Sequence, residues 1–585
     1  MAMHSKIKVL LSTEGTYPFH QGGVSTWCDI LVQELKSVDY MIYSVLMNPF
    51  VTQKFQLPSH ASLIKMPLWG TEEPCEHLSV PFSDIYLAKR RTREKEVKQY
   101  FIPLFKQLVE ELLAEIKSPQ KFGSILLQLY QYFQTYEYKA SFKTEATWET
   151  YKQIVLTVCN QAHSGIARPD VYSLIQSIGW IYRFMNIINT PVPKVHVTHA
   201  AAAAFCGIPC VLSKLLNNTP YMLTEHGVYL REQYLSLSKR AYTPFLSTFL
   251  MRFIHSITSL NYTFADQVSP VCQYNTRWET RFGVRPKNIQ VIYNGVDPNI
   301  FIEAPAASQP APTVVMVARV DPIKDIITFM RAAEVVLKQI PEAKFIVYGS
   351  VSVPSYYEEC LELKNQMNLG DSFIFAGHTQ NMAAAYQSGD VIALSSISEA
   401  FPYSVVEGMM TGKPVIATDV GGIAEALGDT GILVPPRDHE QLGQGIIKLL
   451  NDPELRFELG KDGRERALNF FTLERVLDLH LKSYIKMALR VQESAPAELR
   501  PAPAAMQKLY MDKAYSLQAH GLYEEAIRQF RLAIQATPYS VHVPLIFTEI
   551  AAIYNKLGQY DMVLQEMDKC QAYIEMMELK KPDTA

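Results

Sequence analysis

Residues 391–427, VIALSSISEAFPYSVVEGMMTGKPVIATDVGGIAEAL, indicate the fold class. Two short β-branched runs, Val391–Leu394 and Pro414–Thr418, flank a segment of helical character. Strands that alternate with helices are typical of parallel βαβ units. We therefore expect a doubly wound α/β sheet, in which ligands bind at the carboxyl ends of the strands.

Runs of the same kind extend this pattern along the chain. In the second half we expect strands at Thr313–Ala318, Lys344–Tyr348, Ser372–Phe375 and Gly431–Val434. In the first half we expect strands at Ile7–Ser12, Val195–His199, Tyr221–Thr224 and Ile289–Tyr293, and helices at Val24–Leu35, Ser213–Leu216 and Asn275–Phe282. The pattern predicts two Rossmann-like domains that face a cleft, residues 1–290 and residues 291–492, the second closed by a helix from about 473 to 491.

Two all-helical parts accompany these domains. The strand pattern disappears between about residues 83 and 189, where KRRTREKEVKQYFIPLFKQLVEELLAEI (89–116) predicts a helical insertion in the first domain. The Pro/Ala-rich residues 493–505 are typical of a linker. Residues 506–585 carry two copies of a pattern with tetratricopeptide spacing, in which Gly521 and Tyr523 recur as Gly558 and Tyr560. We expect an all-α, tetratricopeptide-like module that packs on the body or on a partner.

Composition excludes several classes of protein. The 585 residues carry a net charge of 55 − 58 = −3, which argues against nucleic acid as the main partner. We expect no membrane span, because no apolar run reaches the required length, and no signal peptide at the N-terminus. The eight cysteines are scattered, so a disulfide framework or zinc site is not expected and a reducing cytoplasm fits better.

Several phosphate and metal motifs are absent. The chain has no GxGxxG, and GMMTGKP (408–414) lacks the spacing and the Ser/Thr of a P-loop. No two aspartates stand two residues apart, so the Asp-x-Asp metal clamp of many nucleotide-sugar enzymes is missing. We expect a cleft enzyme that handles phosphate without a metal or another cofactor.

The strongest candidate for chemistry is the segment that contains Glu399 and Glu407, eight residues apart across a loop that enters a helix. We expect Ser404 to cap this helix, whose N-terminal amides would attract phosphate. A structural alternative is equally open, in which S-V-V-E is a capping box and Glu407 reaches back to the Ser404 amide. Glu399 has no such structural explanation.

A basic pair provides the second candidate. Arg319 and Lys324, in VARVDPIKD (317–325), follow the first strand of the second domain, where ligands of open α/β sheets bind. They could be solvated side chains at a helix start. However, cations there oppose the helix dipole by about 0.3–1 kcal/mol each unless an anion lies between them. A diphosphate ligand would satisfy both.

The first domain offers weaker signals. Gly22 and Gly23 stand immediately before a helix and would allow a ligand to approach the backbone closely. His226 ends a strand in LTEHGVYLRE, and a lone histidine in such a place is more often structural than catalytic.

Together these motifs resemble the retaining GT-B glycosyltransferases of family four. VIYNGVDPNIF (291–301), VARVDPIKD, the pair Glu399 and Glu407, GKPVIATDVGGIAE and GILVPPRD occur in the family's order over about residues 286–470. LSTEGTYPFHQGGVSTW and TEHGVYLRE further resemble the glycosyltransferases of Pel exopolysaccharide synthesis, which have a long helical insertion in the first domain. One departure is Phe401-Pro402-Tyr403, where the family usually has Phe-Gly.

The resemblance implies roles for these residues. Arg319 and Lys324 would hold the donor diphosphate, Glu407 the ribose and Glu399 the transferred sugar, while His226 would approach the sugar near the reacting carbon. Gly22 and Gly23 would border the diphosphate or the acceptor, and Gly349 and His378 would frame the base. Backbone amides at the start of the helix that carries Glu407 would touch the sugar and the phosphate. The residues concerned are Phe401, Pro402, Tyr403, Ser404 and Val405. Domain closure would use a hinge near Asn294–Gly295 and around Phe471.

The implied activity is transfer of a sugar, with UDP-glucose as the favoured donor, to a growing exopolysaccharide or other glycan acceptor. Two alternatives stay open: a nucleotide-sugar epimerase or phosphorylase of the same architecture, and a nucleotide-sugar-binding protein without transferase activity. Because no span is expected, residues 506–585 would recruit the chain to a membrane-embedded polysaccharide-synthase complex, at the inner membrane.

Overall fold

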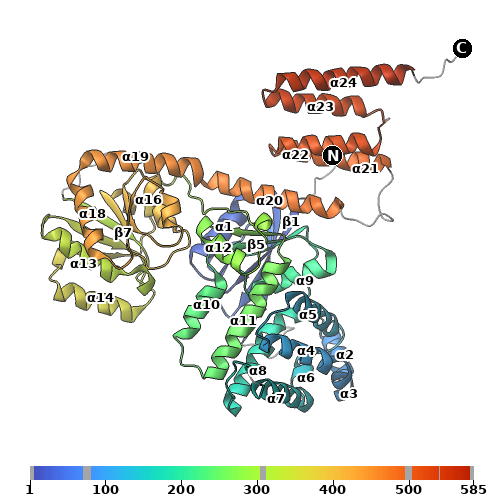
Figure 1. The fold of residues 1–585 in the computed structure, drawn as a ribbon, viewed down its shortest axis with the longest axis horizontal. Helices are drawn as coiled ribbons and strands as arrows, with labels where there is room; N and C mark the ends of the chain where they lie inside the picture. Colours follow the sequence, from blue (N-terminus) through green and yellow to red (C-terminus); the bar gives the residue numbers. More distant parts are fainter. Residues whose placement is uncertain are drawn as a thin grey trace. The chain divides into compact units, whose positions relative to one another are not determined.

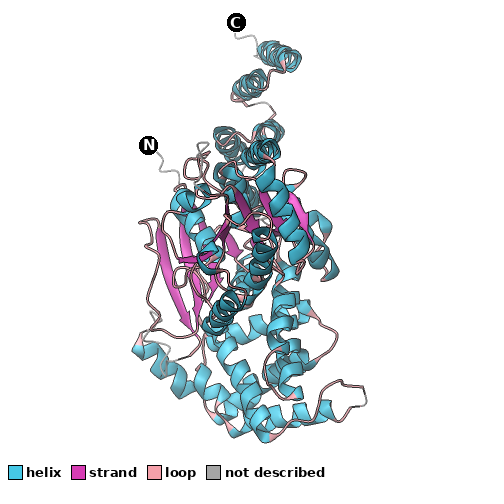
Figure 2. Ribbon diagram, turned by 90° about the vertical axis from the view of Figure 1, so that its left-hand side faces the viewer, coloured by secondary structure: helices cyan, strands magenta, loops and turns pink. Residues whose placement is uncertain are grey.

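The computed structural model describes residues 6–69, 81–161, 163–303, 311–493, 503–538 and 540–579. Contacts divide the chain into two compact units, Met1–Tyr484 and Ile485–Ala585. The first unit contains two parallel sheets of six strands each, which confirms the expected α/β class. In Figure 2 the strands of this unit, in magenta, lie among helices.

The first sheet has the strand order β3-β2-β1-β4-β5-β6. Its strands are β1 (Ile7–Glu14), β2 (Val38–Leu46), β3 (Ala61–Pro67), β4 (Val197–Ala200), β5 (Tyr221–Glu225) and β6 (Gln267–Pro270). The helices that accompany them are α1 (Gly23–Glu34), α9 (Ile208–Asn217), α10 (Tyr229–Ser238), α11 (Pro244–Phe264) and α12 (Gln273–Arg281). The sheet with these helices is called the first lobe below.

The second sheet repeats the same winding, with the order β12-β11-β10-β7-β8-β9. Its strands are β7 (Thr313–Val317), β8 (Lys344–Tyr348), β9 (Phe373–Gly377), β10 (Val391–Leu394), β11 (Val415–Thr418) and β12 (Ile432–Val434). Its helices, which complete the second lobe, are α13 (Ile326–Leu337), α14 (Pro354–Gln366), α15 (Met382–Gln387), α16 (Tyr403–Met410), α17 (Ile423–Leu427), α18 (His439–Asn451) and α19 (Pro453–Phe470).

In each sheet the two central strands are the first and the fourth strand of that lobe along the chain. The winding therefore reverses between β1 and β4 in the first sheet, and between β7 and β10 in the second. Such a reversal opens a crevice at the carboxyl ends of the strands, because the loops on either side turn away from each other. Arg319 and Lys324 follow β7, and Glu399 follows β10. The topology therefore brings these residues to the reversal of the second sheet.

Between β3 and β4 the chain forms only helices within its described residues. They are α2 (Phe82–Arg91), α3 (Glu94–Glu96), the π-helix η2 (Val97–Phe101), α4 (Ile102–Leu113), α5 (Pro119–Phe133), α6 (Tyr138–Phe142), α7 (Glu145–Cys159), α8 (Val171–Met185) and η3 (Asn186–Asn189). In Figure 1 they gather beside α11. Their apolar side chains, among them Phe101, Phe105 and Phe122, belong to the same core as Tyr43 and Leu223 of the first sheet.

The two lobes are joined by two crossings of the chain that pair with each other. The Val296 amide donates to the Phe471 carbonyl at 2.9 Å, and the Leu473 amide donates to the Val296 carbonyl at 2.9 Å. A Cβ on Gly295 would lie 2.7 Å from Val476, so the crossing strands approach too closely for a side chain. Both segments expected to form the hinge therefore lie side by side.

The long helix α20 (Leu473–Glu493) starts at this crossing. The middle of this helix contacts the first lobe: the Tyr484 hydroxyl lies 2.7 Å from Nδ1 of His199, and the Gln267 side-chain amide donates to the Ser483 hydroxyl at 3.0 Å. The boundary between the two units falls within this helix.

In the second unit, α21 (Pro503–Ala519) packs on α22 (Tyr523–Ala536), and α23 (Val543–Lys556) packs on α24 (Tyr560–Leu579). Figure 1 shows these two helical pairs in red. Ala514, Ala526, Phe530 and Ala551 of these helices are all buried. The linker expected at 493–505 lies mostly outside the described residues.

One expected strand is wrong. Residues 289–293 form no strand, and only Ile289 makes an isolated bridge, to Val268 of β6. The Ile292 amide donates to the Pro270 carbonyl at 3.1 Å, so the segment runs beside β6 without a complete ladder. Its β-branched residues occur where the chain leaves the first sheet for the second lobe. Strands β2, β3 and β6 were not expected.

Candidate active site

A cleft of about 330 Å³ opens between the two lobes. The first lobe contributes residues that follow β5 and residues of α10 and α12; the second lobe contributes the loops after β7, β10 and β11. All four residues expected to be catalytic lie in its lining: His226, Arg319, Lys324 and Glu399. Residues from sequence positions nearly 200 apart are thus brought to one cleft.

An ion pair occupies the second-lobe side of this cleft. The Lys324 ammonium lies 2.5 Å from Oε1 of Glu399, and the two side chains are 16% and 12% exposed. The Ser396 hydroxyl donates to the same carboxylate oxygen at 2.6 Å. Because the pair is largely removed from water, an anion that replaced Glu399 beside Lys324 would meet a nearly desolvated charge.

Backbone contacts hold the loops that carry this pair. The Ser395 hydroxyl donates to the Lys324 and Asp325 carbonyls at 2.9 and 2.8 Å, and the Ile397 amide donates to the Ile323 carbonyl at 2.9 Å. The loops after β7 and β10 are therefore joined to each other by hydrogen bonds. Rotation of either loop would separate the charges.

Gly421 fixes the position of Glu399 from the other side. Its φ is +61°, and a Cβ there would lie 1.6 Å from the Glu399 carbonyl oxygen. The next amide, of Gly422, donates to the Ala400 carbonyl at 2.8 Å. Only glycine allows this close approach, because a side chain would occupy the place of the Glu399 backbone.

Two guanidinium groups face the cleft without an ion pair among the described residues. Arg319 is exposed, and its Nη1 lies 3.3 Å from the Ser352 hydroxyl. Arg231 reaches across from α10, and its Nη1 lies 3.4 Å from the Ser398 hydroxyl. Arginine forms bidentate contacts to phosphate, so both groups are available to an anionic ligand.

The lining as a whole is electrically balanced. Its three basic side chains are matched by three acidic ones, and these six residues are Arg231, Arg319, Lys324, Glu232, Glu399 and Asp419. Positive charge on the second-lobe side of the cleft is therefore local, at the two cations that follow β7, because Glu399 and Asp419 come from the same lobe.

His226 stands at the end of β5 against Trp27 of α1, with the two rings edge to face and 4.6 Å apart. Burial, with a smaller effect of His480, lowers the pKa of His226 to about 3. Its Nε2 is buried and has no hydrogen-bond partner within the described residues. The imidazole is therefore neutral at neutral pH and can give a ligand a hydrogen bond, but no charge.

Glu407 lies on α16 and does not line the cleft. The Tyr386 hydroxyl donates to its Oε2 at 2.5 Å. Burial raises the pKa of Glu407 to about 7, an effect that Tyr386 partly opposes. The capping interpretation of this segment is wrong: the N-cap is Pro402, no side chain caps the helix, and Ser404 is its second residue.

The other expected donor contacts also lie outside the lining of the cleft. Phe401 and Val405 are buried in the core of the second lobe, where Phe401 packs between Tyr293 and Phe471. The other expected donor contacts that do not line the cleft are Gly22, Gly23, Gly349, His378, Pro402, Tyr403 and Ser404.

Gly349 and His378 nevertheless follow strand ends, whereas Gly22 and Gly23 lie at the start of α1. Gly349 donates its amide to the Gly377 carbonyl at 2.9 Å, and a Cβ on Gly349 would lie 1.9 Å from the Ala318 carbonyl oxygen, next to Arg319. His378 follows Gly377 and is exposed. A Cβ on Gly22 or Gly23 would meet nothing within 4 Å, so space is open at the start of α1.

Several cleft residues were not anticipated from the sequence. They are Gly227, Val228, Arg231, Glu232, Tyr274, Asn275, Trp278, Ile323, Ile397, Ser398, Ala400, Asp419, Val420 and Gly421. The residues that follow β10 and β11 lie inside or beside the sequence motifs that resemble the glycosyltransferase family. The residues on α12, Tyr274, Asn275 and Trp278, belong to no such motif. Its position depends on Glu425 of the second lobe, whose carboxylate accepts the Gln273 amide at 2.8 Å and the Tyr293 hydroxyl at 2.6 Å.

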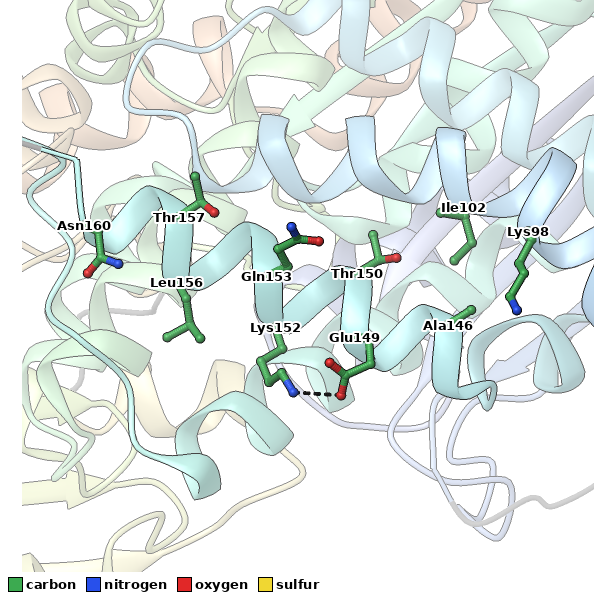
Figure 3. Close-up of a pocket in the computed structure, with 10 residues that line it drawn as sticks. All are labelled: Lys98, Ile102, Ala146, Glu149, Thr150, Lys152, Gln153, Leu156, Thr157 and Asn160. Atoms are coloured by element: carbon green, nitrogen blue, oxygen red, sulfur yellow. Dashed lines mark hydrogen bonds and ion pairs between the residues drawn. The ribbon is translucent and has the colours of Figure 1, made fainter.

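Two further hollows do not contain any expected site residue. One, of about 590 Å³, lies between α7 and the segment of η2 and α4 (Figure 3). Its Lys152 is paired with Glu149 at 2.7 Å, and its Lys98 is paired with Glu94 at 2.6 Å. The other, of about 900 Å³, lies in the second unit between α21 and the loop that precedes α23.

Two sequence-level expectations concern the whole chain. Among the described residues, no helix has the length and apolar character needed to cross a membrane. The seven cysteines that the structure describes are all free; Cys75 lies outside the described residues.

The twice-repeated winding and the cleft between the lobes define a two-lobed α/β protein of the GT-B fold. The chain is similar in structure to sucrose-phosphate synthase from Thermosynechococcus elongatus, with a TM-score of 0.53 and 18% identity over 83% of this chain and 100% of that one. At this identity the likeness concerns the fold.

The sequence adds two family matches. Residues 299–466, which lie in the second lobe, match the family described as glycosyl transferases group 1. Residues 7–287 match a domain of unknown function (DUF3492).

The chain is also similar to curated relatives. The chain is 28% identical over 209 residues to D-inositol 3-phosphate glycosyltransferase of Kribbella flavida, which is 33% of this chain and 49% of the relative. It is 27% identical over 219 residues to N-acetyl-alpha-D-glucosaminyl L-malate synthase of Bacillus anthracis, 35% of this chain and 56% of the relative. The chain thus spans about half the length of these relatives. The names printed for these two relatives are those of a glycosyltransferase and of a synthase.

Proposed function

We propose that this chain is a retaining, metal-independent glycosyltransferase that moves a sugar from a nucleotide-sugar donor, UDP-glucose, to a growing exopolysaccharide. The observation that carries this proposal is the convergence of His226, Arg319, Lys324 and Glu399 on one cleft between the two lobes. The group 1 glycosyltransferase match of the lobe that contributes three of these four residues supports it.

The chemistry follows from charge. The acceptor hydroxyl oxygen forms a bond to the anomeric carbon as the bond from that carbon to the diphosphate breaks. The hydroxyl proton passes to the departing phosphate on the same face of the sugar, which retains the configuration. Arg319 and Lys324 stabilise the negative charge that grows on this phosphate, and a preorganised donor in such a role contributes about 2.7–4 kcal/mol.

The other site residues bind and orient the donor. Glu399, released from Lys324, accepts hydrogen bonds from the sugar hydroxyls. Neutral His226 holds a hydroxyl near the reacting carbon through its unpartnered Nε2. Glu407 binds the ribose, while Gly349 and His378 frame the base after rearrangement of the strand ends. Cationic side chains fill the role that a metal takes in Asp-x-Asp enzymes.

The remaining parts of the chain adapt this transferase to its acceptor. Helices α2–α8 form the insertion by which the first lobe resembles the glycosyltransferases of Pel exopolysaccharide synthesis. Helices α21–α24 form a tetratricopeptide-like module that recruits the chain from the cytoplasm to a membrane polysaccharide-synthase complex. The small buried residues Ala514, Ala526 and Ala551 at repeat spacing support this module.

Calorimetric titration of the full chain with a panel of nucleotide sugars tests donor choice, and product analysis with and without a saccharide acceptor tests the reaction. Acceptor-dependent release of UDP is expected. Product formed without any acceptor would indicate an epimerase. Phosphate-dependent breakdown of a glycan would indicate a phosphorylase, and donor binding without turnover a binding protein.

A charge-removal pair tests the site itself. The double variant Arg319→Gln/Lys324→Met is expected to lower kcat by at least about 100-fold, because it removes two groups of about 2.7–4 kcal/mol each. The control Arg331→Gln/Lys338→Met removes two cations of the same lobe, one on α13 and one at its C-cap, and is expected to leave kcat unchanged. Equal turnover of the two double variants would refute the proposed site.

A further inference from the structure

The last helix of the second unit, α24, presents an apolar stripe that nothing in the described part of the chain covers. Tyr560, Leu564, Met567 and Ile574 are 67%, 64%, 45% and 37% exposed. At 100° per residue, these four positions fall within an arc of about 80° on one side of the helix. Single exposed apolar residues are ordinary, whereas a continuous row of this kind marks an interaction surface.

The spacing of the stripe has a specific geometry. Successive members are 4, 3 and 7 residues apart, and Gln571 lies in the gap of seven. This is the heptad pattern by which a helix packs along another helix, and a polar residue at one seam position fixes the register of such a pair. The pattern therefore points to a helical occupant.

A different face of α24 packs on the unit's own helices. Cys570 is 5% exposed and packs with Val543 and Phe547 of α23. Glu566 is fully buried and lies 2.5 Å from Nη2 of Arg531 on α22. The stripe is consequently additional to the surface that holds the unit together.

Charge determines the kind of helix that fits. Asp561, Asp568 and Glu575 are exposed and seven residues apart, so they form an acidic row along the edge of the stripe away from the buried face. The Gln571 amide donates to Glu575 at 2.9 Å, which ties the row to the stripe. The one basic residue of α24, Lys569, is paired with Glu566 at 2.7 Å.

We propose that this stripe docks one amphipathic helix of a partner protein, with apolar residues at heptad spacing and a row of lysine or arginine along one edge. Basic side chains would neutralise the acidic row at the flanking positions that set partner choice in paired helices. A second copy of this chain fits less well, because antiparallel pairing would place the two acidic rows against each other. The inference rests on the partner recruitment proposed above and is independent of the transferase chemistry.

The test uses the full chain and two synthetic helices of about four heptads, with leucine at the seam and either lysine or glutamate at the flanking positions. Fluorescence anisotropy is expected to show at least tenfold tighter binding of the lysine helix. The variant Asp561→Lys/Asp568→Lys/Glu575→Lys is expected to reverse this preference. The control Glu358→Lys/Glu359→Lys/Glu362→Lys makes the same change of charge on α14 and should keep it.

A second variant, Leu564→Ser, is expected to weaken binding of both peptides, since it removes the centre of the exposed stripe without touching the buried face. Circular dichroism checks that the helical content of all variants is unchanged. Equal affinity for the two peptides, or no binding of either, would overturn the proposal. So would a dimeric mass in light scattering that Leu564→Ser converts to a monomer.

The outcome is separable from that of the proposed function. Sugar transfer to a soluble acceptor is expected to be the same for wild type and for all α24 variants. If the chain transfers sugar but does not select between the two peptides, only the proposed docking surface is refuted. If the chain binds the lysine peptide selectively but transfers no sugar, only the proposed enzymatic function is refuted.

Discussion

The substitution Gly421→Ala tests how the backbone positions Glu399. An alanine Cβ would lie 1.6 Å from the Glu399 carbonyl oxygen, and real Cβ atoms essentially never approach closer than 3.0 Å. Residue 421 and the Glu399 backbone must therefore separate by at least 3.0 − 1.6 = 1.4 Å. We expect this separation to displace the Glu399 carboxylate from the position in which Lys324 and Ser396 hold it, at 2.5 and 2.6 Å.

The expected effect on catalysis is large. Because a misplacement of about 1 Å can cost about 100-fold in rate, we expect kcat/KM to fall by that factor or more. The positive φ of +61° adds strain of about 1–2 kcal/mol, which lowers stability as well. The measurement is UDP release with UDP-glucose, or with the donor that titration identifies, together with a thermal unfolding curve.

Gly370→Ala is the matched control, because Gly370 also has a positive φ, of +45°, but a Cβ there would meet nothing within 4 Å. This variant should lose stability by a similar amount of strain and keep kcat/KM within about threefold. If both variants lost activity equally, strain alone would explain the loss and the positioning role of Gly421 would be refuted.

Two further predictions concern stability. Burial raises the pKa of Glu407 from 4.5 to about 7, so between these values the folded chain holds a proton that the unfolded chain has lost, and stability falls as pH rises through about 7. Glu407→Gln removes this term, so its melting temperature relative to wild type should increase between pH of about 5 and about 8; a constant difference would contradict the assignment. Glu425→Gln weakens the anchoring of α12 across the lobes at a cost of about 1 kcal/mol and should alter the small-angle scattering curve, whereas Asp438→Asn, at the start of α18 within one lobe, should only lower the melting temperature.

The second sheet was predicted closely from the sequence. Lys344–Tyr348 and Val391–Leu394 match β8 and β10 residue for residue. Strands β7, β11 and β12 differ from the prediction by one residue at one end, and β9 differs by one residue at its start and two at its end. Strands that are covered on both faces appear as continuous β-branched runs between polar loops, which is a strong local signal.

The first sheet was predicted less well. The strand β6 (Gln267–Pro270) has four residues, two of them polar, and begins three residues after the end of α11, so it gives no β-branched run. Residues 289–293 give such a run but lie where the chain leaves the sheet. A local run of β-branched residues indicates that a segment is buried. It does not indicate whether a neighbouring strand completes the hydrogen-bonded ladder.

The sequence placed Arg319, Lys324, Glu399 and His226 at the ends of their strands, because residues that follow a parallel strand emerge at the carboxyl edge of the sheet whatever the rest of the fold does. Only the tertiary structure decided that Lys324 and Glu399 form a pair, that Arg231 and α12 complete the cleft, and that Glu407 lies outside its lining beside Tyr386. These contacts join segments separated by up to hundreds of residues. Their geometry is set by the packing of whole loops and lobes, which no local period or motif encodes.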